Sequence, residues 1–369
     1  MSASRGCADP AHVFPVAAAR HTPVIGGNRR TMTTAHEFHL VRRPHGFPDT
    51  DDFDLVEREL PEPGPGEAVV ANRAFSVDPY MRGRMNDVPS YVAPFRLNEA
   101  MDGRSVGEVT AVGDGVSEVA VGDLVLGNLA WRDRGISKAK HLQKVPDVEG
   151  VDPKAYLGVL GAPGLTAWVG LLDKASFRSG DAVFVSGAAG AVGSLVGQIA
   201  KQKGASRVVG SAGSAEKVAW LTDELGYDAA FNYKDGPVAE QLAKALPDGL
   251  DVYFDNVGSE HLEAAIDVAN DHARVAACGA IAHYNDTEDD PTPGPRNLFK
   301  IVKKRLSIQG FIVTDSLDRF PAFLSEVTPW VADGRVRFAE TVVEGVDHAV
   351  EAFQGLLRGE NTGKMLVSV

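Results

Sequence analysis

A glycine-rich turn between a short apolar run and a helix is the feature of this sequence with the clearest chemistry. Residues 182–186 read as a buried strand, and a helix with one apolar face is predicted over residues 191–203. Glycines let a backbone approach a pyrophosphate without a Cβ in the way, and the amino end of the next helix attracts the anion. No Gly-Lys-Ser/Thr follows, which excludes a phosphate-binding loop of the NTPase type. The turn predicts a dinucleotide site made by Gly187, Ala188, Ala189, Gly190, Ala191, Val192 and Gly193.

The end of the second strand indicates which dinucleotide is bound. NAD-binding proteins carry an acidic residue about 20 residues after the glycine turn, where it holds the adenosine ribose. Here the predicted strand 207–210 closes with Ser211-Ala212-Gly213-Ser214, and Lys217 follows within one turn of the next helix. An absent carboxylate removes repulsion of a 2′-phosphate and a lysine attracts it, so NADPH is favoured over NADH. Ser211 and Gly213 are counted as cofactor-binding residues. On spacing alone, Lys217 also fits an ordinary solvated helix lysine.

Residues 36–157 have the pattern of a small β-rich domain. Short apolar runs alternate with glycine, proline and aspartate, and Gly113-Asp114-Gly115 is a strong turn signal. Closely spaced short strands favour a barrel or sandwich over strand–helix–strand units. The runs are residues 69–74, 105–112, 119–121 and 124–126.

Residues 158–336 change character and alternate strands with amphipathic helices. This alternation is typical of an α/β domain with a parallel, doubly wound sheet. The last segment, residues 337–369, returns to the first style, with a helix at 346–357 and a strand at 364–369. In the middle region the predicted strands are 182–186, 207–210, 252–256 and 274–278, and the predicted helices are 191–203, 215–225 and 260–268.

The composition narrows the function classes. A chain of 369 residues is expected to form two domains. The net charge of -13 argues against a nucleic-acid or anionic-membrane surface, and no apolar run approaches the roughly 20 residues that span a bilayer. Cys7 and Cys278 are too few for a disulfide framework, which favours a reducing cytoplasm. No HExxH or CxxC motif occurs and the ten histidines are scattered, so no metal site is predicted.

The first 35 residues are predicted to be a disordered extension outside the fold. Residues 1–31 are rich in Ala, Arg and Pro, with Asp9 as their only acid and no long apolar stretch like that of a secretory signal. Two other interpretations stay open: an organelle transit peptide, or a true start at Met32.

Beyond the glycine turn, several further strings occur in order: residues 78–85 (DPYMRGRM), 161–167, 228–234, 253–258, 310–313 and 359–364. Together they resemble the zinc-independent branch of the medium-chain dehydrogenase/reductase superfamily, which includes prostaglandin reductases, leukotriene dehydrogenases and related enone reductases. The resemblance covers residue 36 to the end. It implies a GroES-like β-barrel domain, built from residues 36–157 and the tail, with a Rossmann domain between them. The active site is then expected in the cleft between the two domains.

The resemblance also assigns roles in the site. Lys217 and Tyr233 resemble the pair that recognises the 2′-phosphate, and Asn256 resembles a contact on the nicotinamide side. Phe311, and Asn361 in the tail, are likewise expected to reach the cofactor.

On the substrate side, Tyr284 resembles the active-site tyrosine near the substrate carbonyl and Tyr80 is a substrate-pocket candidate. Arg82 fits a structural role equally well. The reaction implied is NADPH-dependent reduction of the carbon–carbon double bond of α,β-unsaturated ketones or aldehydes, with hydride going to the β-carbon. The developing enolate oxygen then needs a hydrogen-bond donor, which a phenol supplies.

Zinc-dependent members of the superfamily place a cysteine ligand early in the barrel and a Gly-His-Glu string later. This chain has Phe75-Ser76-Val77-Asp78 and Gly103-Arg104-Ser105-Val106-Gly107-Glu108 at those places, without a ligand set. Metal-assisted alcohol oxidation is therefore not expected. Two other functions stay open: an NADPH:quinone reductase, or a non-catalytic NADPH-binding sensor or structural protein. The family also implies a homodimer, and the physiological enone or alkenal substrate is not specified.

Overall fold

The computed structural model describes residues 33–369. The interpretations of residues 1–32 as disorder, a transit peptide or a late start lie outside the described residues. The first strand, β1 (Thr33–Leu40), begins at Thr33, three residues before the predicted start of the first domain at residue 36. Its first three residues pair with the end of β2 (Phe53–Leu60), and Ala35 is fully buried beside Leu60 and Val69.

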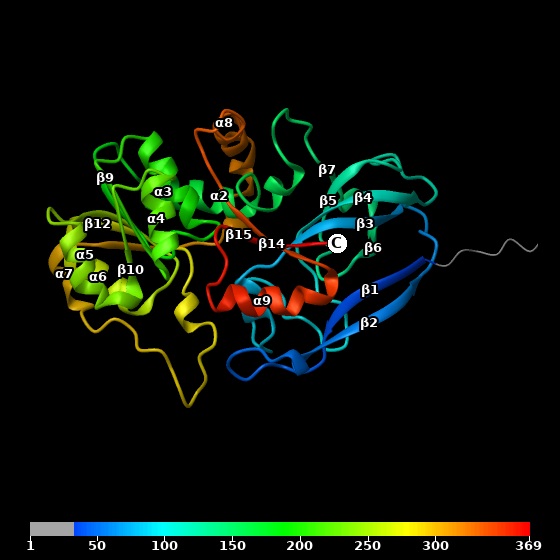
Figure 1. Ribbon diagram of the computed structural model, residues 1–369, viewed down its shortest axis with the longest axis horizontal. Helices are drawn as coiled ribbons and strands as arrows, with labels where there is room; N and C mark the ends of the chain where they lie inside the picture. The colour runs from blue at the N-terminus through cyan, green and yellow to red at the C-terminus, as the bar shows by residue number, and fades with distance from the viewer. Residues whose placement is uncertain (1–32) are drawn as a thin grey trace, which may run out of the picture. The chain divides into compact units, whose positions relative to one another are not determined.

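A six-stranded sheet in which every neighbouring pair is parallel confirms the doubly wound α/β prediction (Figure 1). The chain enters at the centre, moves outward to one edge, returns beside the first strand and then moves to the other edge. The reversal between the first strand and β11 is the switch point at which such sheets bind ligands, beyond the carboxyl ends of the strands. In spatial order the strands are β10 (Ala229–Asn232), β9 (Arg207–Ala212), β8 (Ala182–Val185), β11 (Leu250–Asp255), β12 (Ala269–Ala277) and β13 (Ser307–Gly310).

Alternating apolar side chains hold this sheet between two layers of helices. Val183 and Val185 of β8 belong to one core cluster, with Leu195 of helix α3, and Phe184 belongs to the other, with Tyr253. A strand buried on both faces reads as a continuous apolar run, as β8 does. The helical segments of this region are α2 (Ala162–Val169), η4 (Gly170–Lys174), α3 (Gly193–Gln202), α4 (Ala215–Asp223), η5 (Tyr233–Asp235), α5 (Val238–Ala245), α6 (Ser259–Val268), η6 (Ile281–His283), α7 (Phe299–Lys304), η7 (Val313–Arg319) and α8 (Phe320–Ala332).

The second large sheet combines the early part of the chain with its tail. The tail strand β15 (Lys364–Ser368) pairs antiparallel with β3 (Glu67–Ser76), which brings the last residues beside the early β-rich part of the chain. The exact domain boundaries stay a prediction. The other strands are β14 (Glu340–Glu344), β4 (Ser105–Val112), β5 (Leu124–Gly127), β6 (Arg134–Lys138) and β7 (Gln143–Lys144). The helical segments around it are η1 (Thr50–Asp52), α1 (Tyr80–Arg84), η2 (Ala139–His141), η3 (Pro153–Leu157), η8 (Val346–His348) and α9 (Ala349–Leu357).

One predicted strand is absent. Residues 119–121 form no strand, because their backbone groups serve a turn: the Asp123 amide donates to the Ala120 carbonyl, and the Ala120 amide donates to the Asp123 carboxylate. Two predicted helices are also shorter. The helix predicted from residue 191 begins at Gly193, since the glycine turn occupies the residues before it, and the helix predicted to residue 225 ends at Asp223.

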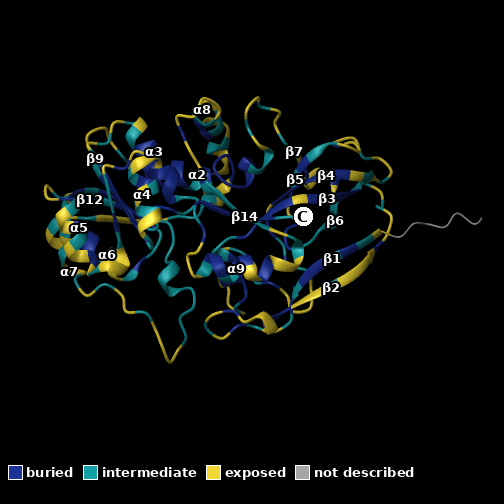
Figure 2. Cartoon of the chain, in the orientation of Figure 1, coloured by how far each residue is buried: buried dark blue, intermediate teal, exposed yellow. Residues whose placement is uncertain are grey.

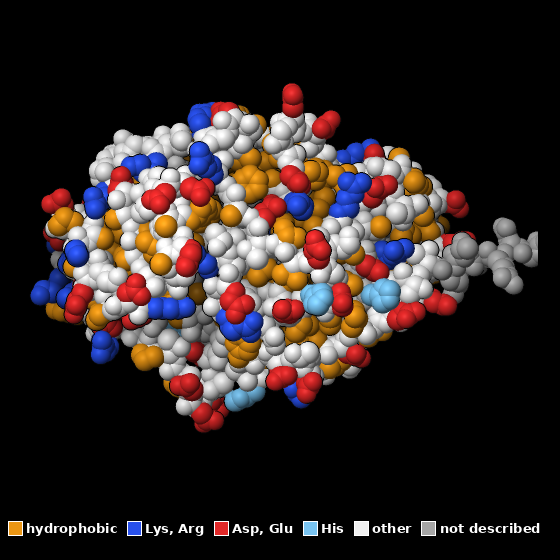
Figure 3. Space-filling view, in the orientation of Figure 1, with side chains coloured by type: hydrophobic (Ala, Val, Ile, Leu, Met, Phe, Trp, Pro, Cys, Tyr) orange, Lys and Arg blue, Asp and Glu red, His pale blue; other side chains and the backbone are white. Residues whose placement is uncertain are grey.

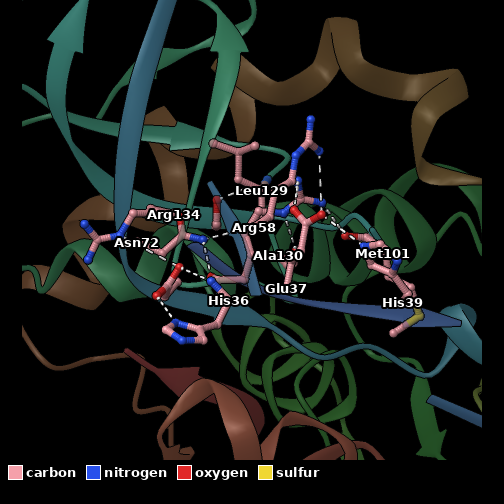
Figure 4. A network of polar contacts seen from close by, with 12 residues as sticks. His36, Glu37, His39, Arg58, Asn72, Met101, Leu129, Ala130 and Arg134 are labelled. Atoms are coloured by element: carbon pink, nitrogen blue, oxygen red, sulfur yellow. Dashed lines mark hydrogen bonds and ion pairs between the residues drawn. The ribbon is translucent and has the colours of Figure 1, made fainter. Parts of the chain in front are cut away.

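A buried polar network fixes the β1–β2 hairpin to the second sheet (Figure 4). Glu37 of β1 is 2% exposed, and its carboxylate lies 3.0 Å from His39 Nε2 and 3.5 Å from the Arg132 guanidinium. Asn72 of β3 donates to the backbone carbonyls of Leu129 and Arg132. β1 is accordingly mostly buried whereas β2 is mostly exposed (Figure 2).

The described residues contain no helix long and apolar enough to cross a membrane. On the face seen in Figure 3, lysine and arginine side chains are interspersed with aspartate and glutamate rather than gathered into a basic area.

Candidate active site

The glycine turn lies at the carboxyl end of β8 and winds around the carbonyl of Gly187. Gly187 has a φ of +58°, and the Gly190 amide donates to its carbonyl at 3.1 Å. A Cβ at Gly193, the first residue of α3, would lie 2.5 Å from that same oxygen. Substitution there requires the turn to open, so glycine is needed at this position, and α3 begins here with the amino end that can attract an anion.

The two alanines of the turn serve packing. Ala188 and Ala189 are buried, and the Ala188 amide donates to the Ser211 carbonyl on β9 at 2.9 Å. A Cβ at Gly210 would meet the Ala188 methyl at 2.8 Å, so this methyl occupies the space above β9. Ala191 and Val192 are half-buried at the start of the helix.

Ser211 and Gly213 are the cofactor-binding residues predicted at the end of β9. Gly213 faces Tyr233, whereas Ser211 does not present its side chain to the site. Ser211 is fully buried, and its hydroxyl has no hydrogen-bond partner among residues 33–369. Its contribution to the turn is the backbone carbonyl. At Gly213 a Cβ would come within 3.2 Å of the Tyr233 ring, so the glycine gives that ring room.

Lys217, Tyr233 and Lys234 gather beyond the ends of β9 and β10. The Lys217 ammonium donates to the Gly359 carbonyl at 2.6 Å, and the Lys234 ammonium lies 5.7 Å from the Tyr233 ring centroid. Burial lowers the pKa of Lys217 from its ordinary value, and the Lys234 charge lowers it further. Two cations and a phenol suit a phosphate. Lys234 was missed by the sequence reasoning; its signal is its place directly after Tyr233 in the string 228–234.

Asn256, just beyond β11, is held against the end of β8. Its side-chain amide donates to the Ser186 carbonyl at 2.8 Å, and its backbone amide donates to the Ser186 hydroxyl at 3.0 Å. The adjacent Asp255 is buried and accepts bonds from Tyr253 and from the amides of Val257 and Gly258. Burial raises the pKa of Asp255, and these hydrogen bonds oppose the rise. This network fixes the loop at the switch point.

Tyr284 follows η6 in the loop after β12. The Ile281 and Ala282 amides donate to the carbonyls of Asn256 and Val257, so the Tyr284 loop lies along the Asn256 loop. Burial is the main cause that raises the pKa of Tyr284 to about 12, with Tyr91 and Cys278 adding to it. The phenol is therefore neutral at physiological pH and available as a hydrogen-bond donor.

Tyr80 and Tyr91 belong to the early, β-rich part of the chain and approach the same region as Tyr284. Tyr80 is the half-buried first residue of α1, and burial, followed by Asp78, raises its pKa well above the ordinary value. Tyr91 is 61% exposed, and it lies close enough to Tyr80 and Tyr284 to raise the pKa of both. Sequence reasoning missed Tyr91, which stands in a loop without a periodic pattern.

The tail reaches the glycine turn through Gly363. The Gly363 amide donates to the Ala189 carbonyl at 2.8 Å, and Gly363 forms a parallel bridge with Gly190. A Cβ at Gly363 would lie 1.9 Å from the Ala339 carbonyl, so no larger residue fits. Asn361 is buried beside this bridge, and its amide donates to the Gly363 carbonyl at 2.7 Å.

Phe311, by contrast, places its side chain in the core. Its ring is perpendicular to that of Phe254, with 6.4 Å between centroids, and it lies 2.6 Å from where a Cβ at Gly170 would stand.

The order of the strands places these groups in a line along the carboxyl ends of the strands. Tyr233 lies beyond β10, Lys217 beyond β9, the glycine turn beyond β8, Asn256 beyond β11 and Tyr284 beyond β12. Strands lie about 4.8 Å apart, so the line is about 19 Å long. It runs from the Lys217–Tyr233–Lys234 cluster through the glycine turn to the neutral phenol of Tyr284. No three His, Cys, Asp or Glu side chains in residues 33–369 are grouped to hold a metal ion.

Comparison with known proteins places this chain among oxidoreductases. Residues 36–145 match a family described as the N-terminal domain of oxidoreductase, and residues 191–329 match one described as zinc-binding dehydrogenase. Bacillus subtilis YfmJ, named as an NADP-dependent oxidoreductase, is 46% identical over 92% of this chain and 99% of its own. The 2-alkenal reductase (NADP+-dependent) of Nicotiana tabacum is 40% identical over 88% of this chain and 94% of its own. 

Among solved structures, CurA from Vibrio vulnificus in complex with NADPH superposes with a TM-score of 0.85. It is 39% identical and covers 90% of this chain and 99% of its own. With relatives of this identity spanning nearly their whole length, the chain belongs to the zinc-independent branch of the medium-chain dehydrogenase/reductase superfamily, among NADP-dependent oxidoreductases that include alkenal, curcumin and prostaglandin reductases.

Proposed function

We propose that this protein uses NADPH to reduce the carbon–carbon double bond of α,β-unsaturated ketones and aldehydes. The observation that carries the proposal is the order of groups along the sheet edge, from the Lys217–Tyr233–Lys234 cluster to the neutral phenol of Tyr284. The tight turn at Gly187 and Gly193, where a Cβ at Gly193 would collide with the Gly187 carbonyl, fits the pyrophosphate of a dinucleotide.

The chain's own residues bind, orient and stabilise charge. NADPH, when bound, supplies the hydride, which adds to the β-carbon while the double-bond electrons move to form an enolate. Tyr284 donates a hydrogen bond to the enolate oxygen, where negative charge develops. A proton from solvent water then adds to the α-carbon, the enolate electrons return to re-form the carbonyl, and the saturated product is complete. Tyr80 and Tyr91 flank the substrate.

An absorbance assay at 340 nm tests this function against its alternatives. The purified protein receives NADPH or NADH with a 2-alkenal, an alkyl enone or a quinone in separate reactions. We expect fast NADPH loss with the alkenal or enone and slow loss with NADH. Turnover of the quinone alone would assign a quinone reductase instead, and NADPH binding without turnover of any acceptor would assign a sensor or structural role.

The pH dependence of the Tyr284 contribution is a second expected result. Because the pKa of Tyr284 is raised to about 12, its phenol stays protonated as the pH rises through 10, the ordinary value for tyrosine. The ratio of kcat between the wild type and Tyr284→Phe should therefore stay constant from about pH 6 to pH 10. Other titrating groups affect the kcat of both proteins alike, so their effect cancels in this ratio. A ratio that declines towards one in this range would show that Tyr284 ionises there.

We also propose that the protein is a homodimer formed through the β13 edge of the six-stranded sheet. Within the described part of the chain no strand pairs with the outer side of β13, and all four of its residues are exposed. The neighbouring Phe299 and Val302 of α7 are 71% and 69% exposed. An open strand edge beside an apolar helix face is a common pairing surface.

Replacing both Phe299 and Val302 with glutamate should convert this dimer to a monomer, measured by light scattering after size-exclusion chromatography. Charges of like sign at a twofold interface repel and resist desolvation. Val121→Glu, at a 61% exposed valine in a turn of the other sheet, is the matched control and should leave the dimer intact. A monomeric wild type, or a double variant that remains dimeric, would contradict the proposal.

A cytoplasmic location is proposed from the free thiol of Cys278, the one cysteine in residues 33–369. Cell fractionation tests it, and recovery in an oxidising compartment would overturn it.

A further inference from the structure

Arg82 is a buried arginine that binds backbone carbonyls and amide side chains instead of a carboxylate. It is 2% exposed and lies in α1 two residues after Tyr80, and each guanidinium hydrogen bond found within residues 33–369 goes to a neutral acceptor. Its Nε donates to the Gly46 carbonyl at 3.1 Å and to Asn285 Oδ1 at 3.2 Å. One terminal nitrogen donates to Asn86 Oδ1 at 2.8 Å and the other to the Gly46 carbonyl at 2.7 Å.

These bonds join three segments that are far apart in sequence. Gly46 lies in the loop after β1, Arg82 lies in α1, and Asn285 directly follows Tyr284 in the loop after β12. The first and third segments also touch each other: a Cβ at Gly46 would lie 3.4 Å from the Thr287 methyl group. Arg82 therefore ties the Tyr284 loop to the helix that carries Tyr80.

The planar guanidinium suits this junction better than an ammonium would. Its five N–H donors are fixed in one plane and reach acceptors on different segments at once, whereas a lysine presents a single nitrogen on a flexible stem. Removing the guanidinium leaves buried carbonyls without donors, and the Tyr284 loop then loses its link to α1.

We propose that Arg82 is a positioning residue for double-bond reduction, which holds the Tyr284 phenol in register with the substrate side of the site through Asn285. The proposal rests on the proposed function. Arg82 itself is placed two residues from Tyr80 and acts on the reaction through the loop it anchors. A displacement of about 1 Å at a reacting group can lower a rate by about 100-fold, so a loosened loop is expected to act on kcat.

The first test measures enone reduction in Arg82→Lys and Asn285→Ala, alone and combined with Tyr284→Phe. Each single variant should lower kcat by about 10- to 100-fold, while the dissociation constant for NADPH, measured by fluorescence, changes less than about twofold. In the Tyr284→Phe background the same changes should lower kcat by less than about twofold, because the phenol that they position is already absent.

Asn86→Ala is the matched control for this test. It removes one hydrogen bond to the same guanidinium from the α1 side and leaves the link to the Tyr284 loop intact. It should retain kcat within about twofold. Equal losses in Asn86→Ala and Asn285→Ala, or losses of equal size with and without the Tyr284 hydroxyl, would overturn the positioning role.

Hydrogen–deuterium exchange provides a readout that does not depend on turnover. Amides in residues 281–292 should exchange faster in Arg82→Lys and Asn285→Ala than in the wild type, while those of β8 and α3 keep their wild-type rates. Unchanged exchange in residues 281–292 would overturn the inference. If the variants exchange faster as expected but the wild type reduces no enone, the proposed function is overturned instead.

Discussion

Replacing Tyr284 with phenylalanine is expected to lower kcat for enone reduction by about 100-fold. The change removes one hydroxyl and retains the ring, so packing in the loop after β12 is kept. The lost group is a neutral phenol, held protonated by burial, that donates to the oxygen on which charge develops. Hydrogen-bond donors and general acids at such positions contribute about 10²- to 10⁴-fold to rates.

Steady-state kinetics with NADPH and an alkyl enone measure this effect, and the dissociation constant for NADPH should stay unchanged. Tyr91→Phe is the control, because Tyr91 is 61% exposed and lies close to Tyr284. It should lower kcat far less than Tyr284→Phe does. If Tyr284→Phe retained the wild-type kcat, Tyr284 would have no part in the chemistry and the enolate would need another donor.

Replacing Lys217 with alanine is expected to reduce the preference for NADPH over NADH by about 10- to 100-fold. A hydrogen bond to a charged group contributes about 1.5–3 kcal/mol, and a lysine opposite a 2′-phosphate makes such a bond only with NADPH. Lys217 is half-buried beside Tyr233 and Lys234, where solvent screens its charge less than on an open surface.

The ratio of kcat/KM for NADPH to that for NADH measures this preference. Lys201→Ala is the control. Lys201 forms an ion pair with Asp228, which directly precedes β10 and so lies at the amino ends of the strands, opposite the site. Lys201→Ala should leave the ratio unchanged. If the ratio were unchanged in Lys217→Ala, Lys217 would be an ordinary helix lysine. Tyr233 and Lys234 would then make the contact with the 2′-phosphate.

The parts of the structure that depend on local patterns could be predicted from the sequence. The apolar run of β8 and the glycines after it specify a strand, a turn and a helix within a few residues of one another. The repeated alternation of strands and helices then predicts the parallel sheet, and the sheet places Asn256 beside the turn. Roles taken from family resemblance, such as those of Tyr233 and Tyr284, rest on matching strings rather than on geometry.

The parts that depend on tertiary packing could not be predicted in this way. Whether Ser211 points into the core or out of it, and whether the Phe311 ring packs on Phe254, depends on side-chain direction at strand ends. Tyr91 and the partners of Arg82 come from segments without periodicity, which the fold brings to the site from a distance.

The most direct test of the central claim follows the hydride itself. The protein is supplied with an alkyl enone and NADPH carrying deuterium at both C4 positions of the nicotinamide, and the product is analysed by mass spectrometry and NMR. We predict a saturated ketone with one deuterium on the β-carbon and a solvent-derived hydrogen on the α-carbon. Deuterium on the carbonyl carbon of an allylic alcohol, with the double bond intact, would contradict double-bond reduction.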